Sequence, residues 1–376
     1  MGNLDVELYS GEAFDQNVAA VIPRNPDHLP AVWCFLQSDA FRQSVRIQDK
    51  ALKVTNGTFV KVPFDLALWR ILAQERYPDG LPEPPSNDPT QCTFDGDIST
   101  SLRPLHVGIA LLTGHRWIQL CADTDVPALV DEDGIVCLAP IRGEPAAADR
   151  LASLLAHAHG DRWSPALLAE LLAAEGGAPS LDVWLRDAFF EQHCKLFHQR
   201  PFIWHVWDGR KDGFSALANY HKLDRRTLES LTYTYLGDWI ARQQEGARRN
   251  ETGAEARLAA ARDLQDRLRL ILDGEPPYDV FVRWKPLEEQ PVGWAPDLDD
   301  GVRLNIWPFV KAGVLRKAPN IKWGKDRGRN PPGAPWGEER WNRYEDIPPA
   351  ARPEALRGVK ELTNAVKRAA REAAAR

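Results

Sequence analysis

The sequence contains almost no methionine, few cysteines and no long apolar run. One methionine stands beside 14 tryptophans among 376 residues, so apolar contacts are expected from rigid rings, not from flexible thioethers. The five cysteines are odd in number and scattered, which is typical of reduced thiols and argues against a disulfide framework. No run reaches the roughly 18 apolar residues of a membrane-spanning helix, and the acidic start lacks the basic and apolar regions of a signal peptide. We therefore expect a cytoplasmic protein.

The motifs of several enzyme classes are also missing. The sequence has no Gly-x-Ser-x-Gly elbow, no phosphate-cradling loop and no Glu-x-Lys nuclease triplet on a plausible strand. Five possible zinc ligands are interleaved with Trp and Phe and lack a Cys-x-x-Cys pair, so hydrogen-bonded histidines are the favoured interpretation. These five are His193, Cys194, His198, His205 and His221. The sequence predicts no catalytic, cofactor-binding or metal-binding residue.

The charge is unevenly distributed along the chain. The hydrophobic content of 44% and charged content of 27% are ordinary for a globular protein with a core. The net charge of −6 argues against a nucleic-acid binder, but the part from Arg303 onward holds 17 Lys and Arg against 8 Asp and Glu, about +9. A solvated basic face and a phosphate-binding surface both agree with this distribution.

Residues 28–66 are predicted to form a helix followed by a strand. Apolar residues recur at helical spacing from Leu29 to Val45. An extended run then includes Leu52, Val54, Thr58, Val60 and Val62, and stops at Pro63. Amide and ammonium side chains, which can contact base edges and phosphates, surround this joint. They are Gln48, Lys50, Lys53, Asn56 and Lys61.

A central aromatic stretch predicts a β-hairpin followed by helices. Ile203–Trp207 is the expected first strand, Asp208-Gly209 is the turn, and the chain resumes at Phe214. Arg210 and Lys211 then lie at the turn, where they meet either DNA or solvent. The apolar spacing from Leu228 to Leu272 predicts helices that end at Gly274.

Three ordered stretches resemble large adenine-specific DNA methyltransferases of type IIG restriction–modification and phage-defence systems. Lys53-Val54-Thr55-Asn56, followed by Val60-Lys61-Val62-Pro63-Phe64-Asp65, is similar to the end of their target-recognition domains and of type I specificity subunits. The aromatic stretch from Phe189 to Leu223 and the stretch from Asp299 to Gly328 follow in the same order. The resemblance implies the target-recognition and downstream part of such an enzyme.

The catalytic motifs of that family have no counterpart here. Adenine methylation needs a pocket for S-adenosylmethionine and an Asn/Asp-Pro-Pro-Tyr/Phe loop that stacks on the flipped base. Asn330-Pro331-Pro332 is followed by Gly333, which supplies no ring. The resemblance therefore implies double-stranded DNA as one partner, and a catalytic subunit or the missing N-terminal half, which would bring S-adenosylmethionine, as the other. Either the chain is a separate subunit or its reading frame is truncated.

The expected fold class is α+β with several small domains, because strands and helices are segregated along the sequence. The expected segments are 1–80, the tail of a target-recognition-like domain; 81–103, a Pro-rich linker; 104–180, a small Ala/Leu helical domain; 181–274, the aromatic hairpin with helices; 275–345, a basic Trp/Gly/Pro-rich segment; and 346–376, a C-terminal helix. If the first segment lacks partner strands, it should expose apolar surface.

Candidate DNA contacts come from the first segment, the hairpin and the basic segment, where Trp323 could stack or pack. They are Lys50, Lys53, Asn56, Lys61, Arg210, Lys211, Lys222, Lys322, Trp323, Lys325, Arg327 and Arg329. A function of a different class also agrees with the sequence: a protein–protein interaction module without direct DNA contact. The net charge of −6 and the many tryptophans favour that alternative.

Overall fold

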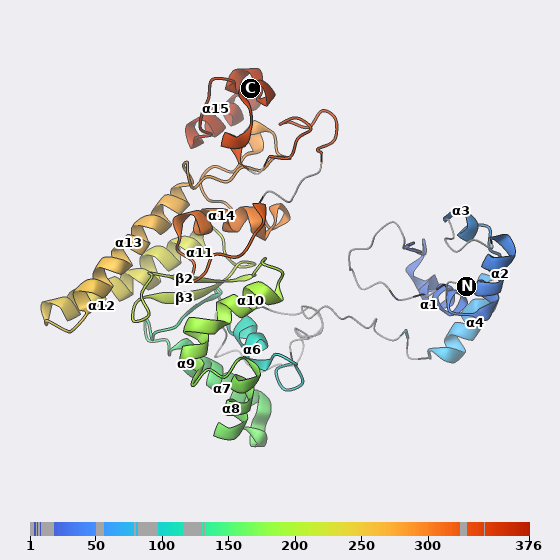
Figure 1. Ribbon diagram of the computed structural model, residues 1–376, viewed down its shortest axis with the longest axis horizontal. Helices are drawn as coiled ribbons and strands as arrows, with labels where there is room; N and C mark the ends of the chain where they lie inside the picture. Colours follow the sequence, from blue (N-terminus) through green and yellow to red (C-terminus); the bar gives the residue numbers. More distant parts are fainter. Residues whose placement is uncertain are drawn as a thin grey trace. The chain divides into compact units, whose positions relative to one another are not determined.

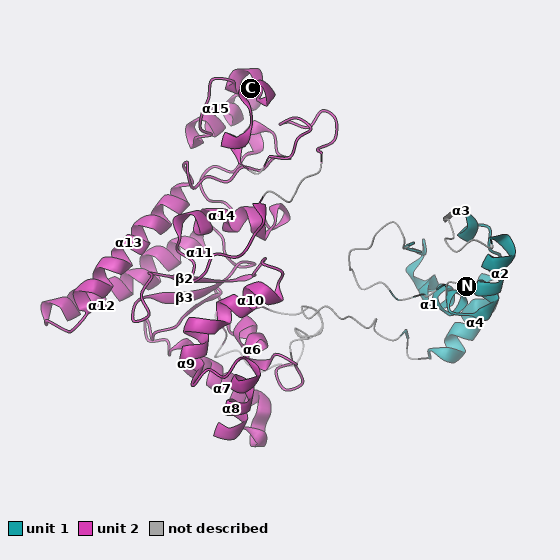
Figure 2. Ribbon diagram, viewed as in Figure 1, with its two compact units in different colours: residues 1–91 teal, residues 92–376 magenta. Residues whose placement is uncertain are grey.

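The protein is described by a computed structural model (Figure 1). It describes residues 4, 6, 8, 19–49, 56–78, 80–81, 97–115, 130, 132–323, 329–341 and 343–376. The chain divides into two compact units, residues 1–91 and 92–376 (Figure 2). Helices combine with a small antiparallel sheet, so the expected α+β class is confirmed. The finer division into six segments stays a prediction.

The described part of the first unit is helical. Its elements are η1 (Pro26–His28), α1 (Leu29–Leu36), α2 (Asp39–Gln48), α3 (Asn56–Phe59) and α4 (Leu66–Arg76). The single helix expected after residue 28 is divided at Ser38. The Ser38 hydroxyl accepts a hydrogen bond from the Phe41 N–H at 3.1 Å and so caps α2. Asp65 caps α4 in the same way.

The strand expected over residues 52–62 is wrong where the structure describes it. Asn56–Phe59 forms one helical turn, and the chain bends at Lys61. Phe59 and Val62, three residues apart, both pack on the core of the unit, whereas Val60 is 84% exposed. Apolar residues at alternate positions thus gave a misleading signal, because packing on neighbouring helices decides the local structure. Residues 50–55 lie outside the described residues.

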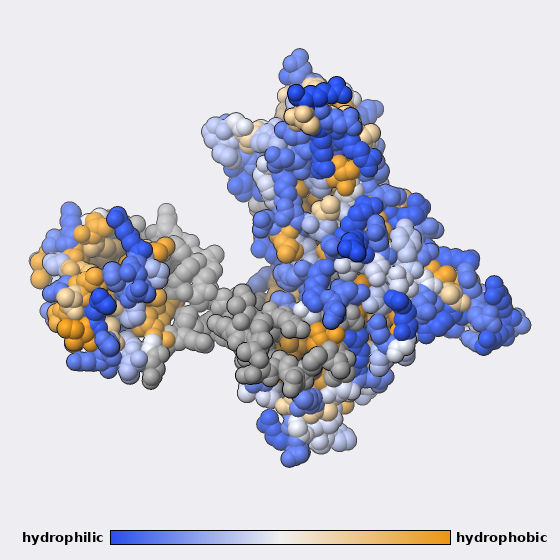
Figure 3. Space-filling model, turned by 180° about the vertical axis from the view of Figure 1, so that it is seen from behind, coloured by the Kyte–Doolittle hydropathy of each residue, from blue (hydrophilic) through white to orange (hydrophobic). Residues whose placement is uncertain are grey.

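The first unit has a small core and much exposed apolar surface. Phe35, Phe41 and Val45 form its buried cluster. The apolar exposure expected for this segment is present (Figure 3, left side). The exposed large apolar side chains are Val21, Ile22, Leu29, Ile47, Val60, Phe64, Leu68 and Ile71.

The second unit is organised around a three-stranded antiparallel sheet. The strands β1 (Ile135–Cys137), β2 (Ile203–Trp207) and β3 (Ser215–Asn219) lie in the order β1-β3-β2. The predicted hairpin of β2 and β3 is confirmed, with Val206 paired to Ala216. The Asp208 carboxylate holds the connecting turn by accepting hydrogen bonds from the backbone N–H groups of Arg210 and Phe214, at 3.0 and 2.8 Å.

Helices from both sides of the hairpin in sequence complete this unit. Before it come α6 (Pro104–Leu112), α7 (Ala147–His159), η2 (Gly160–Arg162), α8 (Pro165–Ala174), α9 (Leu181–Trp184), the π-helical η3 (Leu185–Phe189) and α10 (Phe190–Leu196). After it come α11 (Arg225–Glu229), the π-helical η4 (Ser230–Tyr235), α12 (Leu236–Arg248) and α13 (Ala254–Asp273). The helices α12 and α13 lie side by side (Figure 1). As predicted, α13 ends at Gly274.

The C-terminal part adds one helix to the sheet and a second small core beyond it. The elements are η5 (Leu287–Glu289), η6 (Leu298–Asp300), α14 (Val302–Ala312), η8 (Tyr344–Asp346), η9 (Pro349–Ala351), η10 (Glu354–Leu356) and α15 (Asn364–Ala374). Phe309 of α14 packs on Trp204 of β2, with ring centroids 4.9 Å apart. The second core is formed by Phe281, Trp336, Tyr344, Ile347, Leu356 and Leu362.

None of the helices in the described ranges is long and apolar enough to cross a membrane.

Candidate nucleic-acid interface

The helix α14 presents a basic and aromatic face opposite the side that packs on the core. Ile306 and Phe309 are fully buried on the inner side. Arg303, Trp307 and Lys311 follow one another at intervals of four residues, so they lie along one face of the helix. Trp307 is half-buried and Lys311 is exposed. The core contacts thus fix the direction in which this outer face points.

Side chains from two later segments converge on Trp307. The Trp323 ring meets the Trp307 ring edge to face, with centroids 4.9 Å apart and an interplanar angle of 74°. The Lys311 Nζ lies 5.9 Å from the Trp307 centroid and the Arg343 Cζ lies 6.0 Å from it. The Arg303 Cζ lies 5.8 Å from the Trp323 centroid. We call this set, together with the exposed Lys322 that precedes Trp323 in the sequence, the Trp307 surface; it consists of Arg303, Trp307, Lys311, Lys322, Trp323 and Arg343.

The cations of the Trp307 surface are neutralised only in part. Arg343 forms a bidentate pair with Asp346, and this hydrogen bonding raises the pKa of Arg343 above its usual value. Lys311 and Lys322 are exposed, and neither has an ion pair with a carboxylate within the described ranges. The surface therefore keeps positive charge beside an aromatic pair, an arrangement suited to phosphates and base rings.

Two of the predicted DNA contacts, Lys322 and Trp323, belong to the Trp307 surface. Arg329 is exposed and its guanidinium lies 3.9 Å from the Glu338 carboxylate. Lys325 and Arg327 fall outside the described residues. Trp323 packs against Trp307 and has the Arg303 guanidinium near its ring. Its position is therefore compatible with both the packing and the stacking interpretation.

The predicted contacts at the hairpin are held by other protein groups. Arg210 forms a bidentate pair with Asp212, at 3.0 and 3.1 Å. The Lys211 Nζ lies 3.6 Å from the Asp187 carboxylate, whose pKa is held well below its usual range mainly by Arg186. These carboxylates offset much of the positive charge at the turn. DNA contact here stays a prediction.

The remaining predicted contacts are dispersed. Lys222 donates a hydrogen bond to the Glu132 carbonyl at 3.0 Å. Lys61 is exposed in the turn after α3, in the first unit. Asn56 begins α3, but its side chain is outside the described residues, as are Lys50 and Lys53.

Four members of the Trp307 surface were missed by the sequence reasoning. The positions of Arg303, Trp307 and Lys311 could have been predicted, because a spacing of four residues indicates one face of a helix. Arg343 had none, since it approaches Trp307 only through the folding of the C-terminal segment.

Two of the histidines considered as zinc ligands, His193 and His205, have hydrogen-bond partners within the protein. The His193 Nε2 accepts a hydrogen bond from the Ile203 N–H at 3.1 Å, and the His205 Nε2 is hydrogen-bonded to the Ser215 hydroxyl. Burial lowers the pKa of His205 to about 3, so this imidazole is neutral in the folded protein. Within the described ranges, no three His, Cys, Asp or Glu side chains are grouped to hold a metal ion.

Asn330 of the Asn-Pro-Pro sequence also has a structural role. Its side-chain amide donates to the carbonyls of Gly337 and Glu339, at 3.0 and 3.1 Å, and so holds a turn.

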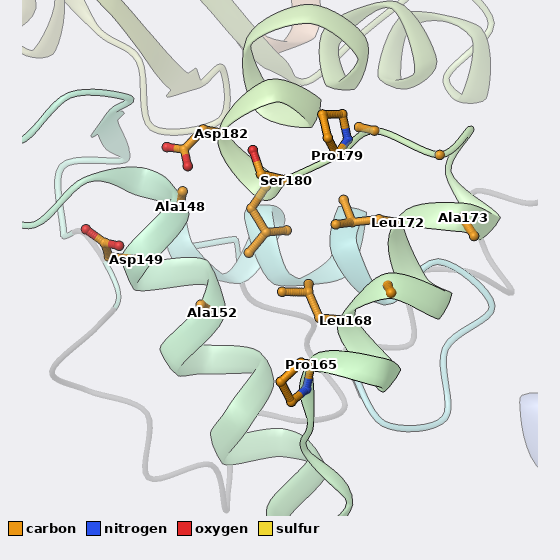
Figure 4. Close-up of a pocket in the computed structure, with 14 residues that line it drawn as sticks. Ala148, Asp149, Ala152, Pro165, Leu168, Leu172, Ala173, Pro179, Ser180 and Asp182 are labelled. Atoms are coloured by element: carbon orange, nitrogen blue, oxygen red, sulfur yellow. The ribbon is translucent and has the colours of Figure 1, made fainter.

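An open hollow of about 610 Å³ lies between α7 and α8 (Figure 4). Small and apolar side chains such as Leu168 and Leu172 line it, and the polar side chains of its lining are Asp149, Asp182 and Ser180. A pocket for S-adenosylmethionine is built from a strand and a glycine-rich turn, and the resemblance implies such a pocket in a catalytic partner. Gly176 and Gly177 follow the helix α8 instead of a strand, so they do not form the strand-to-glycine turn that such a pocket uses.

Comparison with known proteins gives two local similarities, while no protein-family model matches the chain. A stretch of 72 residues is 33% identical to the adenine-specific methyltransferase PglX of Lacticaseibacillus casei (strain Zhang), and covers 18% of this chain and 6% of that protein. A stretch of 137 residues is 26% identical to the adenine-specific methyltransferase BrxX of Escherichia coli O9:H4 (strain HS), and covers 36% of this chain and 11% of that protein. The matches thus span about a tenth or less of these relatives. The chain is therefore similar in part to adenine-specific methyltransferases.

Proposed function

We propose that this chain is the DNA-recognition and scaffold portion of a site-specific adenine DNA methyltransferase, in a restriction–modification or phage-defence system. Methyl transfer would be supplied by a catalytic partner that binds S-adenosylmethionine. The local similarity to PglX and BrxX supports the methyltransferase relation. The observation that carries the DNA contact is the convergence of cations from separate segments on Trp307.

The electrostatics favour DNA at this place, although the whole chain carries a charge of −6. Affinity for DNA comes largely from Lys and Arg side chains that replace the counterions of phosphates, so a local basic surface matters more than the total charge. Lys311 and Lys322 are exposed and can approach a phosphate without breaking an ion pair within the described ranges. Such contacts position the duplex, whereas base reading requires amides or Lys and Arg in a groove.

A titration of labelled duplex DNA tests the proposal. We expect weak binding by the pure chain that falls steeply as salt rises. The double variant Lys311→Ala/Lys322→Ala should weaken binding about five- to tenfold and reduce the slope of log affinity against log salt by roughly 2. Lys195→Ala is the matched control, because this exposed lysine of α10 is paired with Glu191. Absence of binding to any duplex at low salt would overturn the proposal.

The scaffold part has a separate test. The pure chain, incubated with S-adenosylmethionine bearing a radioactive methyl group and with duplex DNA, should transfer no methyl group to adenine. Measurable transfer would contradict the need for a catalytic partner.

A second function, a protein–protein interaction module without DNA contact, is favoured by a specific observation in the first unit. Phe64, Leu68 and Ile71 form an exposed apolar stripe along and just before α4. Apolar patches of this kind are typical of interaction sites. This alternative predicts that DNA does not bind at low salt, and that Leu68→Gln/Ile71→Gln reduces association with the methyltransferase catalytic subunit.

A further inference from the structure

We propose that the Trp307 surface binds an unpaired nucleotide of single-stranded DNA, with its base against the indole of Trp307 and its phosphates near Arg303 and Lys311. This inference rests on the proposed function for the kind of ligand, since both involve DNA. It goes further in the form of DNA: the cations of this surface can hold the phosphates of a duplex or of a single strand, but only a strand with accessible base faces can also use the indole.

Trp307 differs from the tryptophans of the core. Trp204, Trp294 and Trp336 are almost fully buried, and their indole N–H groups donate to the carbonyls of Pro201, Asn305 and Lys285. These three rings are parts of the core, and their indole N–H groups are satisfied by hydrogen bonds.

Trp307 is only half-buried, and its indole N–H has no hydrogen-bond acceptor among the described residues. The ring therefore keeps accessible area and a donor that a ligand can use. Trp323 supports it from one side in an edge-to-face contact, which limits its rotation. A ring held in this way loses little conformational entropy when a base stacks on it.

The cations are placed along the path that a strand would follow. Arg303, Trp307 and Lys311 are separated by about 6 Å along the helix axis per interval of four residues, which is on the order of one nucleotide of an extended strand. Cations therefore stand on both sides of the aromatic group, as required to hold the phosphates that flank a stacked base. In a duplex the base faces are covered by their neighbours, so the indole would have no partner there.

The test measures the affinity of the full chain for three DNA ligands by fluorescence anisotropy at low salt. They are a short oligothymidine, a strand of the same length that carries abasic sites, and a duplex of the same length. We expect the oligothymidine to bind about 5- to 100-fold more tightly than the abasic strand, because stacking adds to the phosphate contacts. Trp307→Ala should abolish this difference, whereas Trp307→Phe should keep part of it.

Trp284→Ala is the matched control, because Trp284 is 45% exposed in the same unit and its N–H donates to Asp300. This control should leave the preference for the base-containing strand unchanged. Equal affinity for the base-containing and abasic strands would overturn the inference, and binding of duplex DNA in that experiment would leave the proposed function in place. Failure of all three ligands to bind would overturn both. Circular dichroism of each variant identifies a loss of folding, and the Trp307→Phe result still decides the question if Trp307→Ala does not fold.

Discussion

The two units of this protein bury very different amounts of apolar surface. The first unit, of 91 residues, has a buried apolar cluster of Phe35, Phe41 and Val45, while eight of its described large apolar side chains are exposed. The second unit is about three times as long, yet only five of its described large apolar side chains are exposed. Its rings meet one another in a continuous core that includes Trp204, Tyr220 and Trp294.

This difference indicates separate roles for the units. A core as small as that of the first unit offers little apolar burial to offset the loss of chain entropy, so its stability should depend on what covers its surface. The larger core of the second unit should keep it folded and hold the Trp307 surface in a fixed geometry. Hydrogen exchange followed by mass spectrometry reports on each unit separately and is the measurement used in the predictions below.

The largest expected effect is the loss of Trp204 from the second unit. Its ring stacks on Tyr220 at 5.1 Å and contacts Phe309 at 4.9 Å, and it is completely buried. Trp204→Ala should lower the free energy of unfolding of this unit by about 3–5 kcal/mol through the cavity that it leaves. Trp69→Ala in the first unit, where the ring is half-buried against Phe35, should cost less than half of that. Equal losses would contradict the contrast between the cores.

A glycine pair tests the tightness of backbone packing in the two units. Gly274 has a φ of +62°, and a Cβ there would lie 2.5 Å from the backbone of Gly293. Gly274→Ala should cost about 2–4 kcal/mol, because backbone strain and overpacking add. Gly80 has a φ of +99° with no atom of the described residues within 4 Å of a Cβ, so Gly80→Ala should cost only the strain, about 1 kcal/mol. A cost at Gly274 as low as that at Gly80 would show that the second unit is less tightly packed than proposed.

Acid should destabilise the second unit more than the first. Burial lowers the pKa of His205 from 6.5 to about 3. Between these values the unfolded chain binds a proton that the folded chain does not, so the free energy of unfolding falls as the pH falls below about 6.5, by about 2 kcal/mol at pH 5 from this group. Hydrogen exchange at pH 7 and pH 5, corrected for the intrinsic rate, should show this loss. The His205→Gln variant should lose less free energy of unfolding between pH 7 and pH 5, whereas the loss in the variant of the exposed His157, His157→Gln, should be unchanged. An unchanged loss in His205→Gln would assign the pH effect to other groups.

Local signals in the sequence were sufficient for much of the second unit. The hairpin was predictable because the aromatic strand Ile203–Trp207 is followed at once by Asp208-Gly209. The start of α8 was predictable because the Ser164 hydroxyl caps it, accepting from the Leu167 N–H at 3.2 Å. By contrast, β1 has only three residues and is stabilised by its pairing with β3, so no local sequence pattern predicts it.

The candidate site shows the same division between local and tertiary information. Lys322 and Trp323 were predictable as a basic aromatic pair. The outer face of α14 was predictable from the spacing of four residues between Arg303, Trp307 and Lys311. The convergence of Trp307, Trp323 and Arg343 was not predictable, because residues 16 and 36 positions apart in the sequence meet only through the packing of the C-terminal part. The wrong strand prediction at residues 56–62 has the same origin, since the neighbouring helices and not the alternation of apolar residues decided the structure there.

The smallest expected effect concerns the exposed stripe of the first unit. Ile71 is 60% exposed on α4, whereas Ala73, two residues later, is buried against the rest of the unit. Ile71→Gln should change the free energy of unfolding by less than about 0.5 kcal/mol, because the side chain buries little surface. Ala73→Gln should cost several times more, because the larger polar group has no room. Hydrogen exchange of both variants measures the two losses of unfolding free energy and so their ratio. A large loss in Ile71→Gln would show that something in the chain covers this stripe in solution, and the contrast between an open first unit and a closed second unit would then fail.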